Sequence, residues 1–331
     1  MTDASREDVA AVVERYGRFA RDEAPGRSAL YAEWATGVAA TPDIANIVAR
    51  IAPTRRQPPL VFGVSRMLGA PEETFAEWAE WLRSHSEEVV AECGRRMLQT
   101  NEPLRCAALL PALAAVEGPI ALIEIGASAG LCMIPDAYAY DYSGVRLEPA
   151  LGDPRVELMC AVEGPVPLRM PEVVWRAGID LAPLDASDPG DRRFLTSLVW
   201  PEEDERRRRI EGALSLAAQH SLRIVAGDAT DAALLRSVLD EAPRDATVVV
   251  TTPGVLPHIA RAGRERLAQT LRSADVTWIS IEPGWMRNDP SPAARDPRAG
   301  SLLLTNDRAM AWVDPLGARM EWRADSSAAA S

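Results

Sequence analysis

The chain has 331 residues, which is enough for one large hydrophobic core or for two ordinary domains. Its formal net charge is -12, from 36 basic and 48 acidic residues, and this excess of acid argues against nonspecific binding to nucleic acid or to an anionic membrane. The sequence contains no lysine, which excludes a phosphate-loop lysine and any Schiff-base mechanism. We therefore expect a small-molecule substrate.

Residues 1–19 carry acids and arginines but no apolar run, so they predict neither a secretory signal nor a transit peptide. No stretch approaches the roughly 18 apolar residues that a membrane span requires. The four cysteines have no paired spacing, and we expect them to be reduced thiols in a cytoplasmic protein. Together with three scattered histidines, they predict no transition-metal site.

The first third of the chain is predicted to be helical. From Ser5 to Ala115 apolar residues recur at helical spacing, and proline-rich breaks at 52–60 and around Pro71 interrupt the pattern. We expect five or six helices there and no strand. Residues 1–117 are predicted to form a helical N-terminal domain that acts as a lid over a second domain.

Residues 118–324 show a different pattern, in which short aliphatic runs alternate with helical stretches at 191–220, 231–241 and 261–274. The first run, Ile120–Ile125, is ended by glycine, as is typical of a parallel strand buried on both faces. The comparable later runs are Val173–Ile179, Leu222–Ala226, Ala246–Thr252 and Val276–Ile281. This alternation predicts an α/β fold with a doubly wound, mostly parallel sheet.

The end of the chain departs from this alternation. The runs 302–305 and 309–313 are followed by the turn sequence Asp314-Pro315-Leu316-Gly317 and by a further run at 319–322, which predicts an antiparallel hairpin. A parallel sheet that ends in such a hairpin is the architecture of the S-adenosylmethionine (SAM)-dependent methyltransferase core. Residues 325–331 are small and polar, and we expect them to be disordered.

In open α/β sheets, ligands bind beyond the carboxyl ends of the strands. The first strand ends at Glu124 and Ile125, and the turn that follows carries Gly126, Ser128 and Gly130, so its backbone can approach a ligand and the helix expected next offers its amides. An acid followed by glycines at alternate positions resembles the methyltransferase pattern, here with serine in the middle. In that interpretation Glu124 holds the amino group of SAM. A tight turn without a ligand is the alternative.

Two later strands also end in acids. Asp180 is predicted to bind the ribose hydroxyls of a nucleoside or, alternatively, to cap a helix ahead of Pro183. Asp228 follows a glycine and resembles the acid that contacts the adenine amine in methyltransferases, and it is also placed to cap a helix near Ala232. SAM is thus the predicted cofactor, although the sequence leaves open that it is absent.

The fourth and fifth strands supply the candidates for proton transfer. We predict His258 as the acid or base, because the ordinary pKa of histidine lies near neutrality. Glu282 is the second candidate for this role. Thr252 is expected to face the substrate.

A polar segment lies just before the helix that leads to the first strand. We predict that Asn101 and Arg105 bind substrate and that Glu102 takes part in catalysis, at the place where the lid would meet the cofactor. The alternative is a helix N-cap by Thr100 or Asn101, with Glu102 in the first turn.

Several segments carry a family resemblance: Gln99–Glu102 with Arg105, Glu124–Leu131, Gly178–Leu181 with Pro183–Asp185, Trp200–Glu202 and Gly227–Ala229. Together they resemble an uncharacterised bacterial domain-of-unknown-function family, the one numbered twenty-three thirty-two, over nearly the whole chain. The resemblance implies a methyltransferase-like core and names no reaction. Residues 251–258 depart from the family, in which a stretch with serine and tyrosine is expected, and this departure leaves the substrate open.

Several functions remain open. The leading hypothesis is methyl transfer from SAM to a small metabolite by positioning of the nucleophile. A second hypothesis keeps the fold but replaces methyl transfer with cyclisation or elimination on an anionic metabolite of specialised metabolism, held by arginines. A serine hydrolase is the third, because Ser128, Asp228 and His258 occur in the order that α/β hydrolases use. A catalytically inert binding protein is the fourth. A homodimer and a complex with a small partner protein also stay open.

Overall fold

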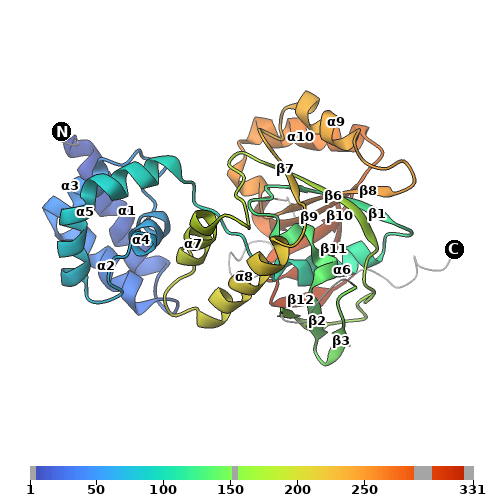
Figure 1. Cartoon of the computed structure of the whole chain (residues 1–331), viewed down its shortest axis with the longest axis horizontal. Helices are drawn as coiled ribbons and strands as arrows, with labels where there is room; N and C mark the ends of the chain where they lie inside the picture. Colours follow the sequence, from blue (N-terminus) through green and yellow to red (C-terminus); the bar gives the residue numbers. More distant parts are fainter. Residues whose placement is uncertain (1–4, 151–155, 287–299, 324–331) are drawn as a thin grey trace. The chain divides into compact units, whose positions relative to one another are not determined.

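The computed structural model describes residues 5–150, 156–286 and 300–323. Within these ranges the protein is a mixed α/β structure with ten α-helices and a large, mostly parallel sheet of nine strands (Figure 1). The chain divides into two compact units, one of residues 1–100 and 188–211 and the other of residues 101–187 and 212–331. This division differs from the expected boundary at 117/118, and the predicted lid role stays a prediction.

The first unit is built from helices, and its core is aromatic. The rings of Tyr16, Tyr31, Trp34 and Trp78 each pack against Phe62 at centroid distances of 5.0–5.7 Å. Such aromatic pairs add to the burial of apolar area. Its helices are α1 (Arg6–Asp22), α2 (Ala29–Ala40), α3 (Pro42–Ala49), α4 (Pro58–Met67), α5 (Phe75–Arg95) and α7 (Pro189–Ser197), and the first residues of α8 (Asp204–Ala217) also belong to it.

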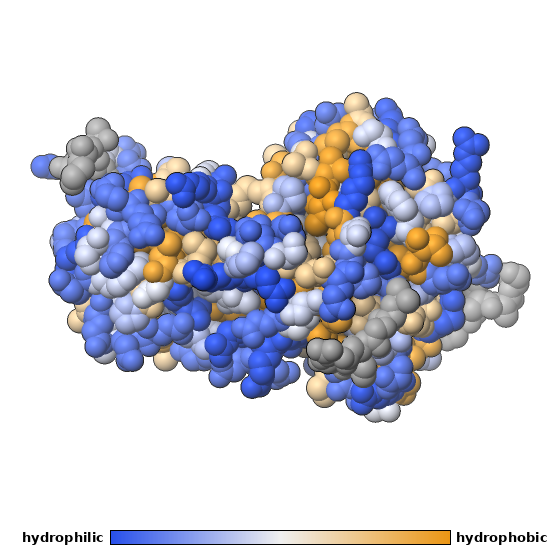
Figure 2. Space-filling view, viewed as in Figure 1, coloured by the Kyte–Doolittle hydropathy of each residue, from blue (hydrophilic) through white to orange (hydrophobic). Residues whose placement is uncertain are grey.

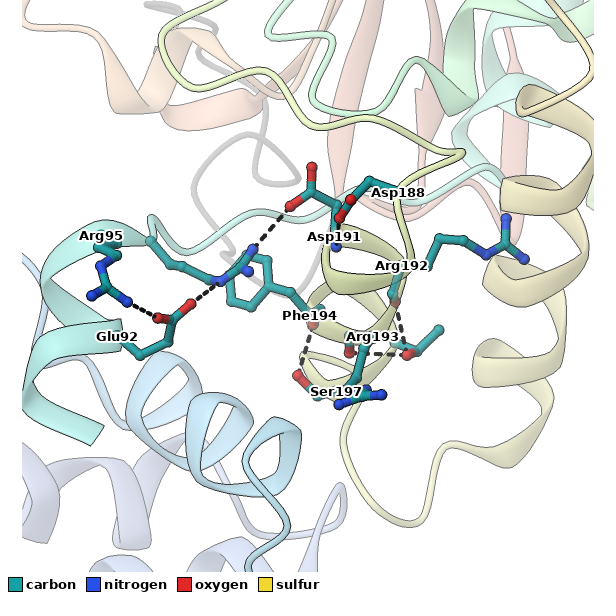
Figure 3. A network of polar contacts seen from close by, with 10 residues as sticks. Glu92, Arg95, Asp188, Asp191, Arg192, Arg193, Phe194 and Ser197 are labelled. Carbon is teal, nitrogen blue, oxygen red and sulfur yellow. Dashed lines mark hydrogen bonds and ion pairs between the residues drawn. The ribbon is translucent and has the colours of Figure 1, made fainter. Parts of the chain in front are cut away.

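Helix α7 joins this unit although it lies far along the chain, and Figure 3 shows the contacts that fix it. The Arg96 guanidinium donates to Glu92 of α5 at 2.7 Å and to Asp191 of α7 at 3.1 Å, and it lies 4.5 Å from the centre of the Phe194 ring. Asp188 caps the helix by accepting from the amide of Asp191. One arginine therefore ties α7 to α5 through charge and through an aromatic face.

The sheet of the second unit has the order β5-β12-β11-β10-β9-β8-β1-β6-β7. The five predicted aliphatic runs are its parallel strands, which pair in the order β7-β6-β1-β8-β9. Their bounds are β1 (Ile120–Ile125), β6 (Val173–Asp180), β7 (Arg223–Ala226), β8 (Thr247–Pro253) and β9 (Thr277–Pro283). Strand β1 is therefore central, with two parallel strands on each side.

The predicted hairpin near the end of the chain is confirmed. Strands β11 (Arg308–Val313) and β12 (Arg319–Trp322) pair antiparallel, and Asp314 accepts from the amides of Leu316 and Gly317 in the turn between them. Strand β10 (Ser301–Thr305) joins this hairpin to β9, again antiparallel. The expected disordered tail, 325–331, lies outside the described residues.

The helix expected directly after the glycine turn is absent from the described residues between β1 and β6, so that prediction was wrong. Two short 3-10 turns, η1 (Leu131–Met133) and η2 (Pro135–Ala137), follow instead. Because proline has no amide hydrogen to donate, Pro135 explains why a longer helix does not form here. After them come β5 (Ala161–Glu163) and a small sheet of β2 (Ala139–Tyr142), β3 (Val145–Leu147) and β4 (Glu157–Met159).

The two faces of the large sheet are covered differently. Helices α9 (Ala232–Leu239) and α10 (Arg261–Ser273) pack on one face, where their leucines join Ile123, Val250 and Trp278 in one hydrophobic cluster. Helix α6 (Arg105–Ala114) contacts β9 and β10 and has no residue in that cluster. Because side chains alternate along a strand, Glu124 points away from the face of Ile123. All of α6 after Arg105 is buried, and its contacts with β9 and β10 explain why it belongs to the sheet unit.

Exposed apolar side chains are unevenly shared between the units. Figure 2 shows a largely hydrophilic surface over the helical unit and more apolar surface over the sheet unit. Of the seven large hydrophobic side chains that are exposed among the described residues, five belong to the sheet unit: Val145, Met159, Val174, Leu181 and Trp285.

Candidate active site

The strand order places a topological switch point between β1 and β8, because successive parallel strands are added to opposite sides of β1. Ligands of open α/β sheets bind at such a point, beyond the carboxyl ends of the strands. The loops that follow β1 and β8 meet at this point. A Cβ built on Gly126 after β1 would lie 2.7 Å from a methyl group of Val255 after β8, so these loops are in close contact.

The glycine turn has the backbone conformation that its sequence predicts, but the amides of Gly126, Ser128 and Gly130 already donate to acceptors within the protein. Gly126, Ser128 and Gly130 have φ values of 78°, 52° and 76°. The Gly126 amide donates to Ile179 O at 2.8 Å, that of Ser128 to Asp180 Oδ2 at 2.8 Å, and that of Gly130 to Ala127 O at 2.7 Å. Residues 127–130 are buried. These three amides are therefore engaged within the protein, and we look to the side chains for groups that could hold a ligand.

Among the candidate residues, Glu124 has the surroundings that point most clearly to a ligand site. It is 3% exposed, and its Oε2 has no hydrogen-bond partner among the described residues. Burial raises its pKa well above 4.5, the nearby carboxylate of Asp180 raises it further, and the charge of Arg105 opposes them. In the absence of a ligand, Glu124 is therefore held in its neutral form more readily than a surface acid.

The segment before α6 closes on this region. Asn101 is 9% exposed, and its Nδ2 has no partner among the described residues. Glu102 is buried, its Oε1 accepts from the Leu104 amide at 3.0 Å, and its carbonyl accepts from the Cys132 thiol at 3.4 Å. The N-cap of α6 is Leu104, without a side-chain capping bond, so the alternative of a cap by Thr100 or Asn101 was wrong.

Arg105 links three segments of the sheet unit. Its Nη1 donates to Pro253 O at the end of β8 at 2.9 Å, and its Nε donates to Pro315 O in the hairpin turn at 3.1 Å. Gly254 has a φ of +76°, and a Cβ there would lie 3.1 Å from Arg105 Nη2. Gly317 leaves room for the backbone of Leu104, since a Cβ at 317 would lie 2.2 Å from Leu104 O. The hairpin turn thus helps to hold Arg105 in place.

Asp180 and Asp228 both accept hydrogen bonds from the main chain. The Asp180 oxygens accept from the amides of Ser128 and Ala182, each at 2.8 Å, so this acid closes the glycine turn. Asp228 is exposed and accepts from the Thr230 amide at 2.8 Å. Neither is a helix cap, because α7 is capped by Asp188 and α9 by Asp231. Glu124, Asp180 and Asp228 still stand at or just beyond the ends of three adjacent strands, β1, β6 and β7.

Thr252 and Glu282 lie on the other face of the sheet from Glu124. Thr252 is fully buried and accepts from Trp278 Nε1 at 3.0 Å, in the face that α9 and α10 cover. Alternation along β9 places Glu282 on the same face as Trp278. The structure therefore does not bring Thr252 or Glu282 together with Glu124. The residue beside Glu124 in β8 is Thr251, which the sequence did not single out.

His258 ends the 3-10 turn η3 (Leu256–His258) after β8, and its side chain is exposed. Partial desolvation and the charge of Arg105 lower its pKa below the usual 6.5, so the imidazole is mostly neutral near pH 7. Among the described residues, no hydrogen bond joins His258 to Ser128 or to Asp228. The catalytic triad of the serine-hydrolase hypothesis is not assembled.

Sequence comparison connects this arrangement to a known group of proteins. A family model described as "Uncharacterized protein conserved in bacteria (DUF2332)" matches residues 13–322. The chain belongs to this family. The DUF2332 match spans both units and every candidate residue named above, and its description carries no reaction. Comparison with curated proteins gives no match.

Among the residues that the structure describes, no three His, Cys, Asp or Glu side chains gather as a metal site would require. None of the helices in the described ranges combines the length and the apolar character of a membrane span.

Proposed function

We propose that the sheet unit of this DUF2332 protein is a small-molecule enzyme that binds its ligand at the carboxyl ends of β1 and β8, and that its reaction is methyl transfer from SAM to a small metabolite. The observation that carries this proposal is the buried carboxyl of Glu124, whose Oε2 lacks a partner among the described residues at the switch point of the sheet. An unsatisfied buried polar group costs about 1–3 kcal/mol. A ligand that hydrogen-bonds to Glu124 offsets that cost.

The side chains fit SAM, whereas the turn amides do not. Glu124 would hold the amino group, and a positive charge there would restore the ionised carboxylate. Asp180 and Asp228 follow in order on the next two strands, where they would meet the ribose hydroxyls and the adenine amine. Each still has lone pairs beyond the main-chain bonds that it accepts. SAM supplies an electrophilic methyl group when it is bound.

His258 is the residue to which we assign proton transfer. It follows β8, on the other side of the switch point from the acids of β6 and β7, and its lowered pKa keeps it neutral near pH 7. A neutral imidazole accepts the proton that the attacking group of the metabolite loses. Glu102 is committed to the Leu104 amide through one oxygen, and we assign it the positioning of the segment before α6.

Isothermal titration with SAM tests the proposal directly. We expect wild-type protein to bind SAM and Glu124→Gln to bind it at least about tenfold more weakly, which corresponds to about 1.4 kcal/mol. Glu117→Gln is the matched control, because Glu117 is exposed and lies just before the same strand. Absence of SAM binding at millimolar concentration would refute methyl transfer.

A second candidate function keeps the site and omits SAM. It is favoured by the closed glycine turn, with its bonded amides and with Val255 against Gly126. In this case Arg105 attracts a small anionic metabolite, and His258 takes the proton from the carbon or internal nucleophile that forms the new double bond or ring bond. The bond to the leaving group breaks at the same time, and neutral Glu124 gives its proton to that group. Turnover of an anionic substrate without SAM, lost in Glu124→Gln, would favour this reaction over methyl transfer.

A further inference from the structure

Asn101 carries a second buried polar atom that the fold leaves unsatisfied. The side chain is more than nine-tenths buried, and its Nδ2 finds no hydrogen-bond acceptor among the described residues. An amide nitrogen only donates, so the missing partner must be an acceptor. This requirement is opposite to that of an ionised Glu124, which needs a donor or a positive charge.

The two orphaned groups belong to connected parts of the site. Asn101 precedes Glu102, whose carbonyl accepts from the Cys132 thiol, and Cys132 lies within electrostatic range of Glu124. Arg105 lies at the start of α6, four positions after Asn101, and its charge acts on both Glu124 and His258. One unsatisfied donor and one guanidinium therefore stand in the same short segment, and the charge of that guanidinium acts on the Glu124 carboxyl.

We propose that Asn101 Nδ2 and the guanidinium of Arg105 form a subsite for a carboxylate. Both groups only donate, and the positive charge selects an anion over a neutral carbonyl. The nearest acid in sequence, Glu102, has one oxygen engaged by the Leu104 amide. This inference rests on the proposed function in one respect, that a ligand binds at this edge of the sheet.

A carboxylate can reach this subsite from two sources. One is the amino-acid end of SAM, whose ammonium group would then meet Glu124. The other is a carboxylate on the metabolite. Three kinds of probe separate the sources. S-adenosylhomocysteine has the amino-acid end, and 5′-methylthioadenosine lacks it. Fluorinated aromatic carboxylates, each paired with the primary amide of the same skeleton, stand for the metabolite, and their binding is followed by fluorine NMR.

Asn101→Asp is the decisive variant, because it keeps the shape of the side chain and replaces the donor with an acceptor. We expect it to weaken binding of S-adenosylhomocysteine or of the aromatic carboxylates by about tenfold or more. Binding of 5′-methylthioadenosine and of the amides should change less than about twofold. Asn46→Asp, in α3 of the other unit, is the matched control and should change neither.

The outcomes separate the subsite from the proposed function. Two results would overturn the subsite alone. In the first, wild-type protein binds 5′-methylthioadenosine but no carboxylate probe. In the second, the Asn101→Asp variant binds every probe as wild type does. Carboxylate binding that depends on Asn101, in a protein that binds neither SAM nor 5′-methylthioadenosine, overturns methyl transfer and leaves the subsite standing. If Asn101→Asp unfolds, Arg105→Lys replaces it, since lysine keeps the charge and loses the planar fork. The same loss of carboxylate binding is then expected, and its absence counts against the subsite.

Discussion

Replacement of Glu124 by methionine should stabilise the protein. Methionine has nearly the same length as glutamate and packs without a polar atom, so it removes the unsatisfied Oε2 and leaves little cavity. Relief of a buried unpaired polar group is worth about 1–3 kcal/mol. For a unit of this size, each kcal/mol raises the unfolding temperature by about 2–4 °C. Urea unfolding followed by circular dichroism measures the change.

The pH dependence of this gain has a fixed sign. Burial raises the pKa of Glu124 in the folded state above its usual 4.5, so between the two values the folded state binds more protons than the unfolded state. The free energy of unfolding of wild-type protein therefore falls as pH rises above 4.5, by up to about 1.4 kcal/mol per pH unit for this one group. Glu124→Met lacks this term, so its advantage should grow with pH.

Glu117→Met serves as control, because an exposed site should change stability by less than about 0.5 kcal/mol at any pH. A Glu124→Met variant that is less stable than wild type at neutral pH would refute the reasoning. So would an advantage that stays constant between about pH 5 and about pH 8. A gain in stability together with a loss of ligand binding would show that Glu124 is retained for function at the expense of the fold.

Two further predictions concern the buried ion pair of Arg176 with Asp136 and the glycine at position 254. Arg176→Met should destabilise the protein by about 3–5 kcal/mol in urea unfolding, because it leaves the buried carboxylate of Asp136, now held at 2.7–2.8 Å, without its partner. The double variant with Asp136→Leu should recover most of the loss, and no recovery would contradict this explanation. Gly254→Ala should cost about 1–3 kcal/mol, since alanine at a φ of +76° is strained and its Cβ meets Arg105. It should weaken carboxylate binding as well, and unchanged binding would show that Arg105 is not held by this contact.

The sequence predicts the large sheet well for a physical reason. Strand β1 is buried at every position and shows the clearest aliphatic run, and the other four parallel strands are less completely buried but still carry short apolar runs. The hairpin is visible for a different reason, because Asp314 and Gly317 have local turn chemistry. Both signals are encoded in a few consecutive residues.

The crossover from β1 to β6 was not predictable in the same way. Strands β2 to β5 have only three or four residues each, which is too short for a periodic pattern to show. The assignment of α6 to the sheet unit and of α7 to the helical unit depends on partners far along the chain, such as Arg96 for α7. Such long-range contacts leave no local trace in the sequence.

The site was predictable in its residue types and not in its hydrogen bonds. Glu124 was identifiable because it ends an aliphatic run. The distinction between Thr251 beside Glu124 and Thr252 on the opposite face requires the strand register, which alternation alone does not fix. The bonding of the Ser128 amide to Asp180 likewise became visible only with β6 in place next to β1.

The contact between Arg105 and Pro315 joins residues 210 positions apart. Protein chains are synthesised from the N-terminus, so this guanidinium lacks its carbonyl partner until Pro315 has been made. Nascent chains stopped before Pro315 would therefore contain all five parallel strands and still lack the hydrogen bond that helps to hold Arg105 at the proposed carboxylate subsite. We therefore expect the proposed carboxylate subsite to form only after the five parallel strands have been made.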